Sequence, residues 1–244
     1  MKSGEYSTDP NDHERKSRIN RIAFERHVRE NNPFKFVTVL PSITGGDIQI
    51  GRELGMYDEN TRFRIIEKGI PGMSKNDYEN SLRDMFNRIF QTSRPLSGHC
   101  ELIYKKLENC IFGKLPQYSS VIDLAYYDTC STFSTVNKWL PNEINTLKHG
   151  APVMMTFFTD YSGRNMDLNY DWLLDYPPVK KKITHYFENN KFTNRRCLET
   201  VEGRLSRLIG YLQTFKILVN KAWLYTEKNS YSSLMVFIDG IYLG

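Results

Sequence analysis

The sequence has no run of about 18 apolar residues, and this absence excludes a transmembrane helix, so we expect no membrane partner. Its first stretch, MKSGEYSTDPNDHERKSR, lacks an apolar core, so we expect no secretory signal. Cysteine is scarce and scattered, with no CxxC pair: Cys100, Cys110, Cys130 and Cys197. That scatter argues against a disulfide framework and a zinc site, and it favours a reducing cytoplasm.

Histidines with metal-ligand spacing are also missing, so no metal is expected. The apolar share of 40% and the charged share of 25% over 244 residues are typical of a folded domain. Residues 1–17 are polar and charged, which predicts a flexible tail ahead of a single domain over 18–244.

Positive charge is concentrated in one segment. Residues 180–221 hold ten Lys/Arg and three Glu, a local net of +7, which leaves about −2 for the rest of the +5 chain. Such a surplus is typical of a nucleic-acid contact. A solvated helical face and a contact with a protein partner are the alternatives.

Apolar patterns alternate between strand-like and helix-like. Strands are expected at 34–42, 61–69, 119–128 and 151–160, and residues 99–107 fit a strand or a helical turn. Helices are expected at 17–30, 47–55, 74–91 and 200–213, and residues 130–150 fit a helix or a broken pair of helices. Ser74 and Asp47 are expected N-caps, and Pro141 fits a first helical position. Residues 215–243 predict a hairpin around the turn EKNS.

This alternation predicts a mostly parallel sheet with helices on both faces and one antiparallel strand from the hairpin. In such sheets ligands bind outside the carboxyl ends of the strands. Acids end three of the expected strands, namely Glu67, Asp128 and Asp160, and the glycine turn ITGGD follows the first strand. Glu67 lies 21 residues past Gly46, near the roughly 20 expected for an acid that binds a ribose diol.

The segments FVTVLPSITGGD, RFRIIEKG, VIDLAYYDTCST and APVMMTFFTD, followed by the terminal hairpin, resemble the class I S-adenosylmethionine-dependent methyltransferases. The order of elements looks most like that of compact methyltransferase-like proteins encoded by bacteriophages. The resemblance implies a Rossmann-like methyltransferase fold: a mostly parallel seven-stranded α/β sheet whose C-terminal hairpin strand is antiparallel and inserts beside the sixth.

The resemblance also implies roles for particular residues. The methionine part of the cofactor would lie against Pro41, Ser42, Gly45 and Gly46, and its ribose against Glu67. Asp128, with Thr129 and Cys130, would occupy the position of the family's substrate-facing motif, with Asp123 as the alternative.

Other candidates have two interpretations each. Tyr126 and Tyr127 could stack on an adenine or a flipped base, or belong to the core. Cys130 could be a nucleophile, although a small buried side chain is the favoured interpretation. The candidate phosphate contacts are Arg195, Arg196, Arg204 and Arg207.

The leading hypothesis is a methyltransferase that uses S-adenosylmethionine, acts on a nucleic acid and removes one proton through Asp128. The alternative is an inactive methyltransferase-like subunit that binds nucleic acid or assembles a phage complex in the host cytoplasm. A third hypothesis is a Rossmann-like enzyme with another adenosyl or nucleotide ligand.

Overall fold

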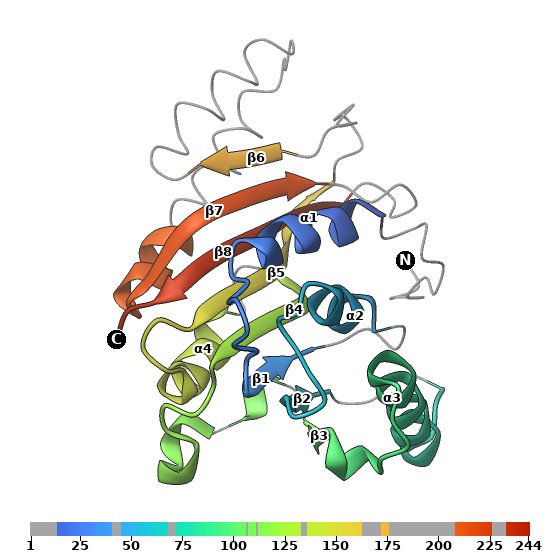
Figure 1. The fold of residues 1–244 in the computed structure, drawn as a ribbon. Helices are drawn as coiled ribbons and strands as arrows, with labels where there is room; N and C mark the ends of the chain where they lie inside the picture. The colour runs from blue at the N-terminus through green and yellow to red at the C-terminus, as the bar shows by residue number, and fades with distance from the viewer. Residues whose placement is uncertain are drawn as a thin grey trace.

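The computed structural model describes residues 14–40, 45–67, 72–105, 107–110, 112–132, 136–162, 172–175, 208–225 and 233–244. Its centre is an eight-stranded sheet in the order β3-β2-β1-β4-β5-β8-β7-β6 (Figure 1). The strands are β1 (Phe36–Val39), β2 (Arg62–Ile66), β3 (Cys100–Ile103), β4 (Leu124–Thr132), β5 (Pro152–Ser162), β6 (Trp172–Asp175), β7 (Ile217–Tyr225) and β8 (Ser233–Tyr242).

The strand directions confirm the predicted fold class. Strands β3, β2, β1, β4 and β5 form a parallel run. Strand β8 is inserted antiparallel between β5 and β7, as the predicted hairpin required. To the seven strands expected, β6 adds one more at the edge, antiparallel to β7. Strand β6 lies in a stretch for which the sequence predicted no strand.

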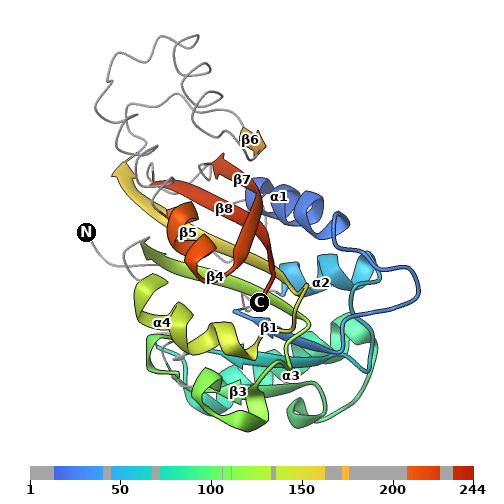
Figure 2. The ribbon, with the colours of Figure 1, turned by 90° about the vertical axis from the view of Figure 1, so that its left-hand side faces the viewer.

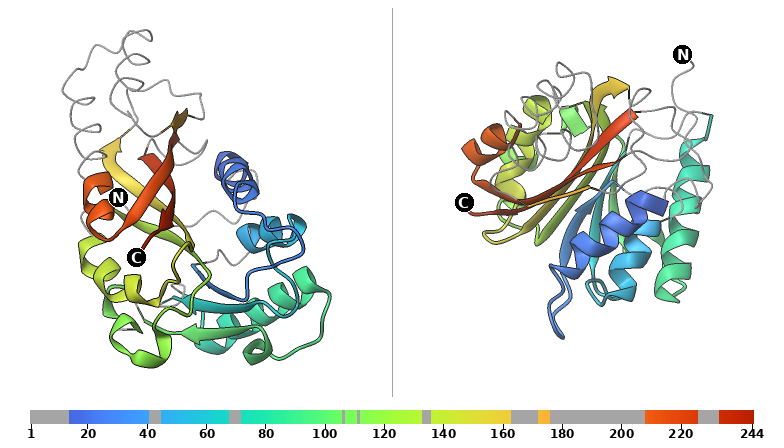
Figure 3. Two further views of the ribbon diagram at one scale, coloured as in Figure 1. Left: turned by 60° about the vertical axis from the view of Figure 1, so that its left-hand side comes forward. Right: turned by 90° about the horizontal axis from the view of Figure 1, so that it is seen from above.

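Helices cover both faces of the sheet (Figures 2 and 3). On one face lie α1 (Glu14–Glu25), α2 (Gly46–Glu53) and α3 (Lys75–Phe90), and on the other lie α4 (Val136–Glu143) and the helical residues 208–214. The remaining elements are 3-10 turns: η2 (Leu96–Gly98), η3 (Leu107–Asn109), η4 (Phe112–Lys114), η5 (Pro116–Tyr118) and η7 (Ile144–Thr146).

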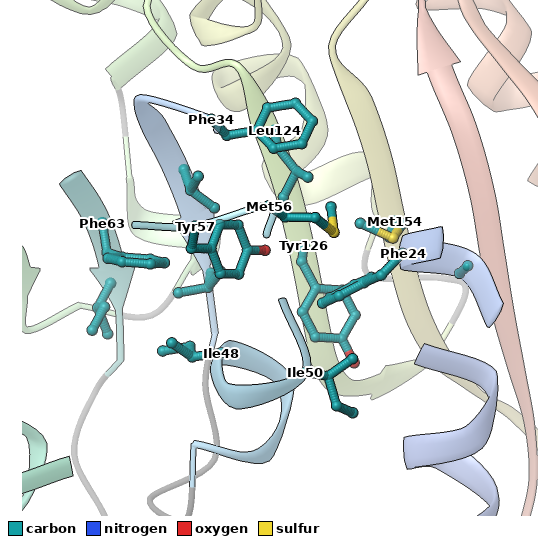
Figure 4. Close-up of a cluster of buried hydrophobic side chains, with 14 of the residues drawn as sticks. Phe24, Phe34, Ile48, Ile50, Met56, Tyr57, Phe63, Leu124, Tyr126 and Met154 are labelled. Atoms are coloured by element: carbon teal, nitrogen blue, oxygen red, sulfur yellow. The ribbon is translucent and has the colours of Figure 1, made fainter. Parts of the chain in front are cut away.

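Each face has its own apolar core. The core beneath α1, α2 and α3 is rich in aromatic rings, and Figure 4 shows Phe24, Tyr57 and Tyr126 packed within it. Phe24 meets Tyr126 edge to face, with ring centroids 5.8 Å apart, a geometry that aromatic pairs favour. The core on the other face joins α4 and residues 208–212 to β4, β5 and β8.

Several predicted boundaries change in the structure. Helix α1 begins at Glu14, inside the predicted tail, and Pro141 lies inside α4 rather than at its first position. Strands β4 and β5 continue past Asp128 and Asp160 instead of ending there. Residues 99–107, for which a strand and a helical turn were both possible, contain strand β3. The predicted cap Ser74 is confirmed, since its side chain accepts a hydrogen bond from the Asp77 backbone N–H.

Within the described ranges, no helix is long and apolar enough to cross a membrane. Among the same residues, no cluster of three or more His, Cys, Asp or Glu side chains is placed to hold a metal ion.

Candidate functional site at the carboxyl ends of β1, β2 and β4

The order of strands reverses between β1 and β4, because the chain builds β2 and β3 on one side of β1 and then returns to its other side. Val39 at the end of β1 pairs with Ile65 on β2 and with Tyr126 on β4. Glu67 and Asp128 therefore each lie two residues beyond a partner of Val39. Their backbones flank the loop after β1 at a separation of roughly 10 Å, two strand spacings. Ligands bind at such reversal points in open α/β sheets.

The loop after β1 leads into α2 through a glycine turn. Gly45 is the N-cap of α2 with φ 66°, a left-handed conformation that favours glycine. A Cβ at Gly45 would collide with Met85, whose Cγ would lie 2.7 Å away, whereas a Cβ at Gly46 would meet no described residue within 4 Å. Gly45 thus lets α2 approach α3, and Gly46 leaves open space. The predicted cofactor contacts Pro41 and Ser42 lie outside the described residues.

Glu67 follows β2 directly, as the sequence predicted. Its backbone N–H donates to the Ile103 carbonyl at 3.0 Å, which fixes the chain at the end of β2. The Glu67 carboxylate lies near the buried Tyr78, whose pKa is raised by desolvation and then by Glu67. Glu67 is half-buried at the expected edge.

Asp128 projects from β4 on the face that carries α1 and α2. One of its oxygens pairs with the Lys16 ammonium from α1, and the other accepts a hydrogen bond from the Thr156 hydroxyl on β5. The pairing register between β4 and β5 shifts between Asp128 and Thr132. The regular pairing of β4 with β5 is therefore interrupted just after Asp128, although β4 itself continues.

Asp47 is the most unusual group of the site. Asp47 was predicted to be the N-cap of this helix, but the N-cap is Gly45 and Asp47 lies in the first turn of α2. Both of its carboxylate oxygens are buried, and within the described residues no side chain donates to them; the backbone N–H groups of Asp47 and Ile48 are near enough to lower its pKa. Desolvation raises the pKa of Asp47 to about 6, the Asp128 charge adds to that shift, and the Lys16 charge opposes it. Lys16, Asp47 and Asp128 therefore form one electrostatic cluster, which we call the charged cluster.

The other predicted residues fall into three groups. Tyr126 and Tyr127 are fully buried in the two cores, which is the second of the interpretations given above. Asp123 lies at the opposite end of β4, where it accepts hydrogen bonds from the backbone N–H groups of Lys35 and Phe36 and from the Lys148 ammonium at 2.6 Å. It is therefore distant from the charged cluster along the strand. The last group lies outside the described part of the chain: the Cys130 side chain, Arg195, Arg196, Arg204 and Arg207.

Thr129 faces away from Asp128. Its buried hydroxyl donates to the Thr156 carbonyl at 2.8 Å, so it supports the pairing of β4 with β5.

Sequence reasoning missed two members of the site and misread a third. Lys16 was assigned to a tail and Thr156 to the interior of a strand, and no local pattern links either to Asp128. Asp47 was interpreted as a cap. The signal that could have found it is an acid directly after two glycines, since the first glycine can itself take the N-cap position of the helix.

No family model and no curated protein matches this sequence. Crystal structures with a similar fold include a 1,6-didemethyltoxoflavin-N1-methyltransferase from Burkholderia thailandensis, solved with S-adenosylhomocysteine bound. It is 8% identical, with a TM-score of 0.49 over 93% of this chain and 78% of that one. A SAM-dependent O-methyltransferase from Thermotoga maritima is 10% identical, with a TM-score of 0.47 over 100% and 69%.

A third similar structure is that of a point mutant of the 16S rRNA (adenine(1408)-N(1))-methyltransferase from Catenulisporales acidiphilia. It is 10% identical, with a TM-score of 0.45 over 99% of this chain and 96% of that one. These neighbours are methyltransferases with different acceptors, and at such identities they assign no activity to this chain. The Rossmann-like methyltransferase fold rests on the strand order itself, with β8 antiparallel between β5 and β7.

Proposed function

We propose that this protein is a methyltransferase that binds S-adenosylmethionine at the carboxyl ends of β1, β2 and β4. The observation that supports this most is the arrangement of two acids, Glu67 and Asp128, on either side of a glycine turn at the reversal point of the sheet. A ribose diol needs a nearby carboxylate, and a bulky cofactor needs backbone without side chains.

The residues fit such a cofactor. The open space at Gly46 would admit the methionine part, and Glu67 would accept hydrogen bonds from the ribose hydroxyls. Bound S-adenosylmethionine supplies an electrophilic methyl group on its sulfonium. The protein holds the acceptor in line with that group. Asp128 is the proton acceptor once Lys16 has left it.

Calorimetric titration with S-adenosylmethionine and S-adenosylhomocysteine tests this function. We expect wild-type protein to bind with a micromolar Kd. Glu67→Ala should weaken binding about tenfold or more, because hydrogen bonds to a charged group are lost. The matched control is Glu79→Ala, which removes an acid whose ion pair with Lys75 is exposed, and it should bind as the wild type does. Absence of binding by wild-type protein would overturn the proposal and favour a non-catalytic role for the fold.

For the acceptor, we propose a nucleic acid contacted by the basic segment 180–221. The support is the local charge of +7, and most of this segment lies outside the described residues. Binding should weaken steeply with salt, and changing Arg195, Arg196, Arg204 and Arg207 to Gln should reduce the slope by up to about one for each lost phosphate contact. Salt-independent or absent binding would point to another acceptor. The compact bacteriophage-encoded type stays a prediction from the sequence.

A further inference from the structure

The ion pair between Lys16 and Asp128 places a primary amine on the proposed proton acceptor. Lys16 lies in the first turn of α1 and Asp128 on β4, and the two side chains are only 19% and 12% exposed. The Lys16 ammonium contacts one carboxylate oxygen, while the Thr156 hydroxyl on β5 donates to the other. Thr156 therefore fixes the orientation of the carboxylate, and the oxygen that would take a proton already touches an amine.

The Lys16 ammonium also lies next to the glycine turn. Its charge lowers the pKa of Asp47, and this effect is larger than that of the Asp128 charge. Asp47 directly follows Gly46 in α2, and a Cβ at Gly46 would meet no described residue within 4 Å. An amine, its proton acceptor and the open space in which the proposed function places part of the cofactor therefore lie together.

A second lysine–aspartate pair serves as a comparison. Asp123, just before β4, accepts a hydrogen bond from the Lys148 ammonium at 2.6 Å. Its other oxygen accepts from two backbone N–H groups at the start of β1, so this pair joins the first residues of the two strands. Asp123 and Asp128 are equally exposed, at 12%, whereas Lys148 is 43% exposed and Lys16 only 19%. Exposure alone would favour modification of Lys148, and position at the carboxyl ends of the strands favours Lys16.

Resting on the proposed function, we propose that Lys16 is a modification site, and that its amine accepts a methyl group from S-adenosylmethionine bound in the same molecule. Asp128 takes one proton from the Lys16 ammonium, and the freed lone pair forms the new N–C bond. The S–C bond of the sulfonium breaks with its electron pair left on sulfur, which releases S-adenosylhomocysteine. Asp128 then passes its proton to solvent. Lys16 ends as a methylammonium and keeps its positive charge.

The fold favours transfer within one molecule. Lys16 is carried on a helix whose other end is held, because Arg26 and His27 after α1 both contact the buried Asp239 of β8 at 2.8 and 2.6 Å. An amine held beside a bound electrophile reacts as an intramolecular group and needs no encounter between molecules. The first turn of a helix opens more readily than its centre, which allows the short movement that aligns the amine with the methyl group. The rate per molecule should therefore be independent of protein concentration.

Mass spectrometry with a labelled cofactor tests this modification. The whole chain is incubated with S-adenosylmethionine that carries a trideuterated methyl group and is then cleaved after glutamate. The resulting peptide 15–25 contains Lys16 as its single lysine. We expect the label on Lys16 and none on Lys148. Lys16→Arg should abolish the label in this peptide, whereas the matched control Lys148→Arg should be labelled as the wild type is.

Two further variants test the role of the carboxylate. Asp128→Asn should lower the rate of labelling about 100-fold or more, because the proton acceptor is lost. Thr156→Val keeps the acceptor but removes the hydroxyl that orients it, and it should lower the rate about tenfold. An unchanged rate in both variants would refute the proposal. A methyl group found on Lys16 of isolated wild type but not of isolated Asp128→Asn would support it, and one found on both would refute it.

Binding of S-adenosylhomocysteine to each variant shows that it is folded and separates this inference from the proposed function. If the wild type binds neither S-adenosylmethionine nor S-adenosylhomocysteine, the proposed function fails and this inference fails with it. If it binds them but Lys16 carries no methyl group on isolation and gains no label, this inference alone is refuted. Equal labelling of Lys16 and Lys148 would refute it as well. A rate per molecule that rises with protein concentration would refute transfer within one molecule.

Discussion

At the scale of single residues, the burial of Asp47 has a consequence for stability. Its pKa in the folded protein is about 6, above the ordinary value of 3.8, because burial penalises the charged form. The folded state therefore holds this proton more tightly than the unfolded chain does. The stability that protonated Asp47 contributes is fully present below about pH 4 and is lost as pH rises through about 6. Lys16 and Asp128 face the same group and modulate the shift.

Asp47→Asn should remove this dependence, because an amide does not ionise. We expect the variant to be more stable than wild type at pH 7.5 by about 1–3 kcal/mol and no more stable at pH 4. Urea unfolding at several pH values between 4 and 7.5 measures the difference. Asp84→Asn is the control, since Asp84 is exposed and pairs only with its neighbour Arg83 among the described groups. Parallel curves for wild type and Asp47→Asn would contradict the expectation.

At the scale of elements, the sequence predicted correctly those features that depend on interactions within a single helix or strand. The apolar stripe and Ser74 cap of α3 are both in place, since capping and period-3.6 burial act within one helix. Strand β6 was missed because it is only four residues long and is defined by its pairing with the edge of β7, which no local pattern reveals. The extension of β4 past Asp128 was missed for a related reason. Asp128 was expected to end the strand, but its hydrogen bond with Thr156 and its ion pair with Lys16 stabilise the carboxylate inside the strand.

The turn into α2 gives an element-scale prediction, because its two glycines have different tasks. Gly45→Ala should destabilise the protein by about 2–4 kcal/mol, since it combines a left-handed conformation with a collision against Met85. Gly46→Ala should change stability by less than about 1 kcal/mol, because its Cβ would enter open space. Urea denaturation compares the two. Gly46→Ala should still weaken S-adenosylhomocysteine binding if that space admits the cofactor.

A folded Gly46→Ala variant that binds normally would show that the cofactor does not approach this glycine. Equal stability losses in the two variants would contradict the packing argument. The pair therefore separates a glycine needed by the fold from a glycine needed by the ligand.

At the scale of the whole molecule, the sheet joins distant parts of the chain. Strand β8, near the end of the sequence, lies in the interior of the sheet between β5 and β7. The contacts that define the site are equally distant, because Lys16 and Asp128 are 112 residues apart. The alternating patterns predicted the parallel run, and the antiparallel insertion of the hairpin strand followed from the resemblance, whereas β4 and β5 run past the two acids expected to end them. The partner of Asp128 could not be predicted, since no local period connects α1 with β4.

The link between α1 and β8 supplies a prediction at this scale. Asp239 is fully buried and contacts both Arg26 and His27 of the turn that follows α1. Asp239→Asn would leave these cationic and imidazole groups without a charged partner, and losing one side of a buried ion pair is costly. Because Arg26 is about one-third exposed, solvent screens part of the loss. We expect a destabilisation of about 2 kcal/mol in urea unfolding.

Hydrogen exchange makes this prediction specific to α1. Amides of residues 14–25 should exchange faster in Asp239→Asn, whereas those of β1 and β2 should change little, because their pairing does not involve Asp239. Glu53→Gln is the control, since the Arg21–Glu53 pair is half-exposed and also joins α1 to the domain. Unchanged protection of α1 in Asp239→Asn would mean that apolar contacts such as those of Ala23 and Phe24 hold the helix by themselves. In that case the ion pairs of Asp239 would contribute nothing to holding α1 on the sheet.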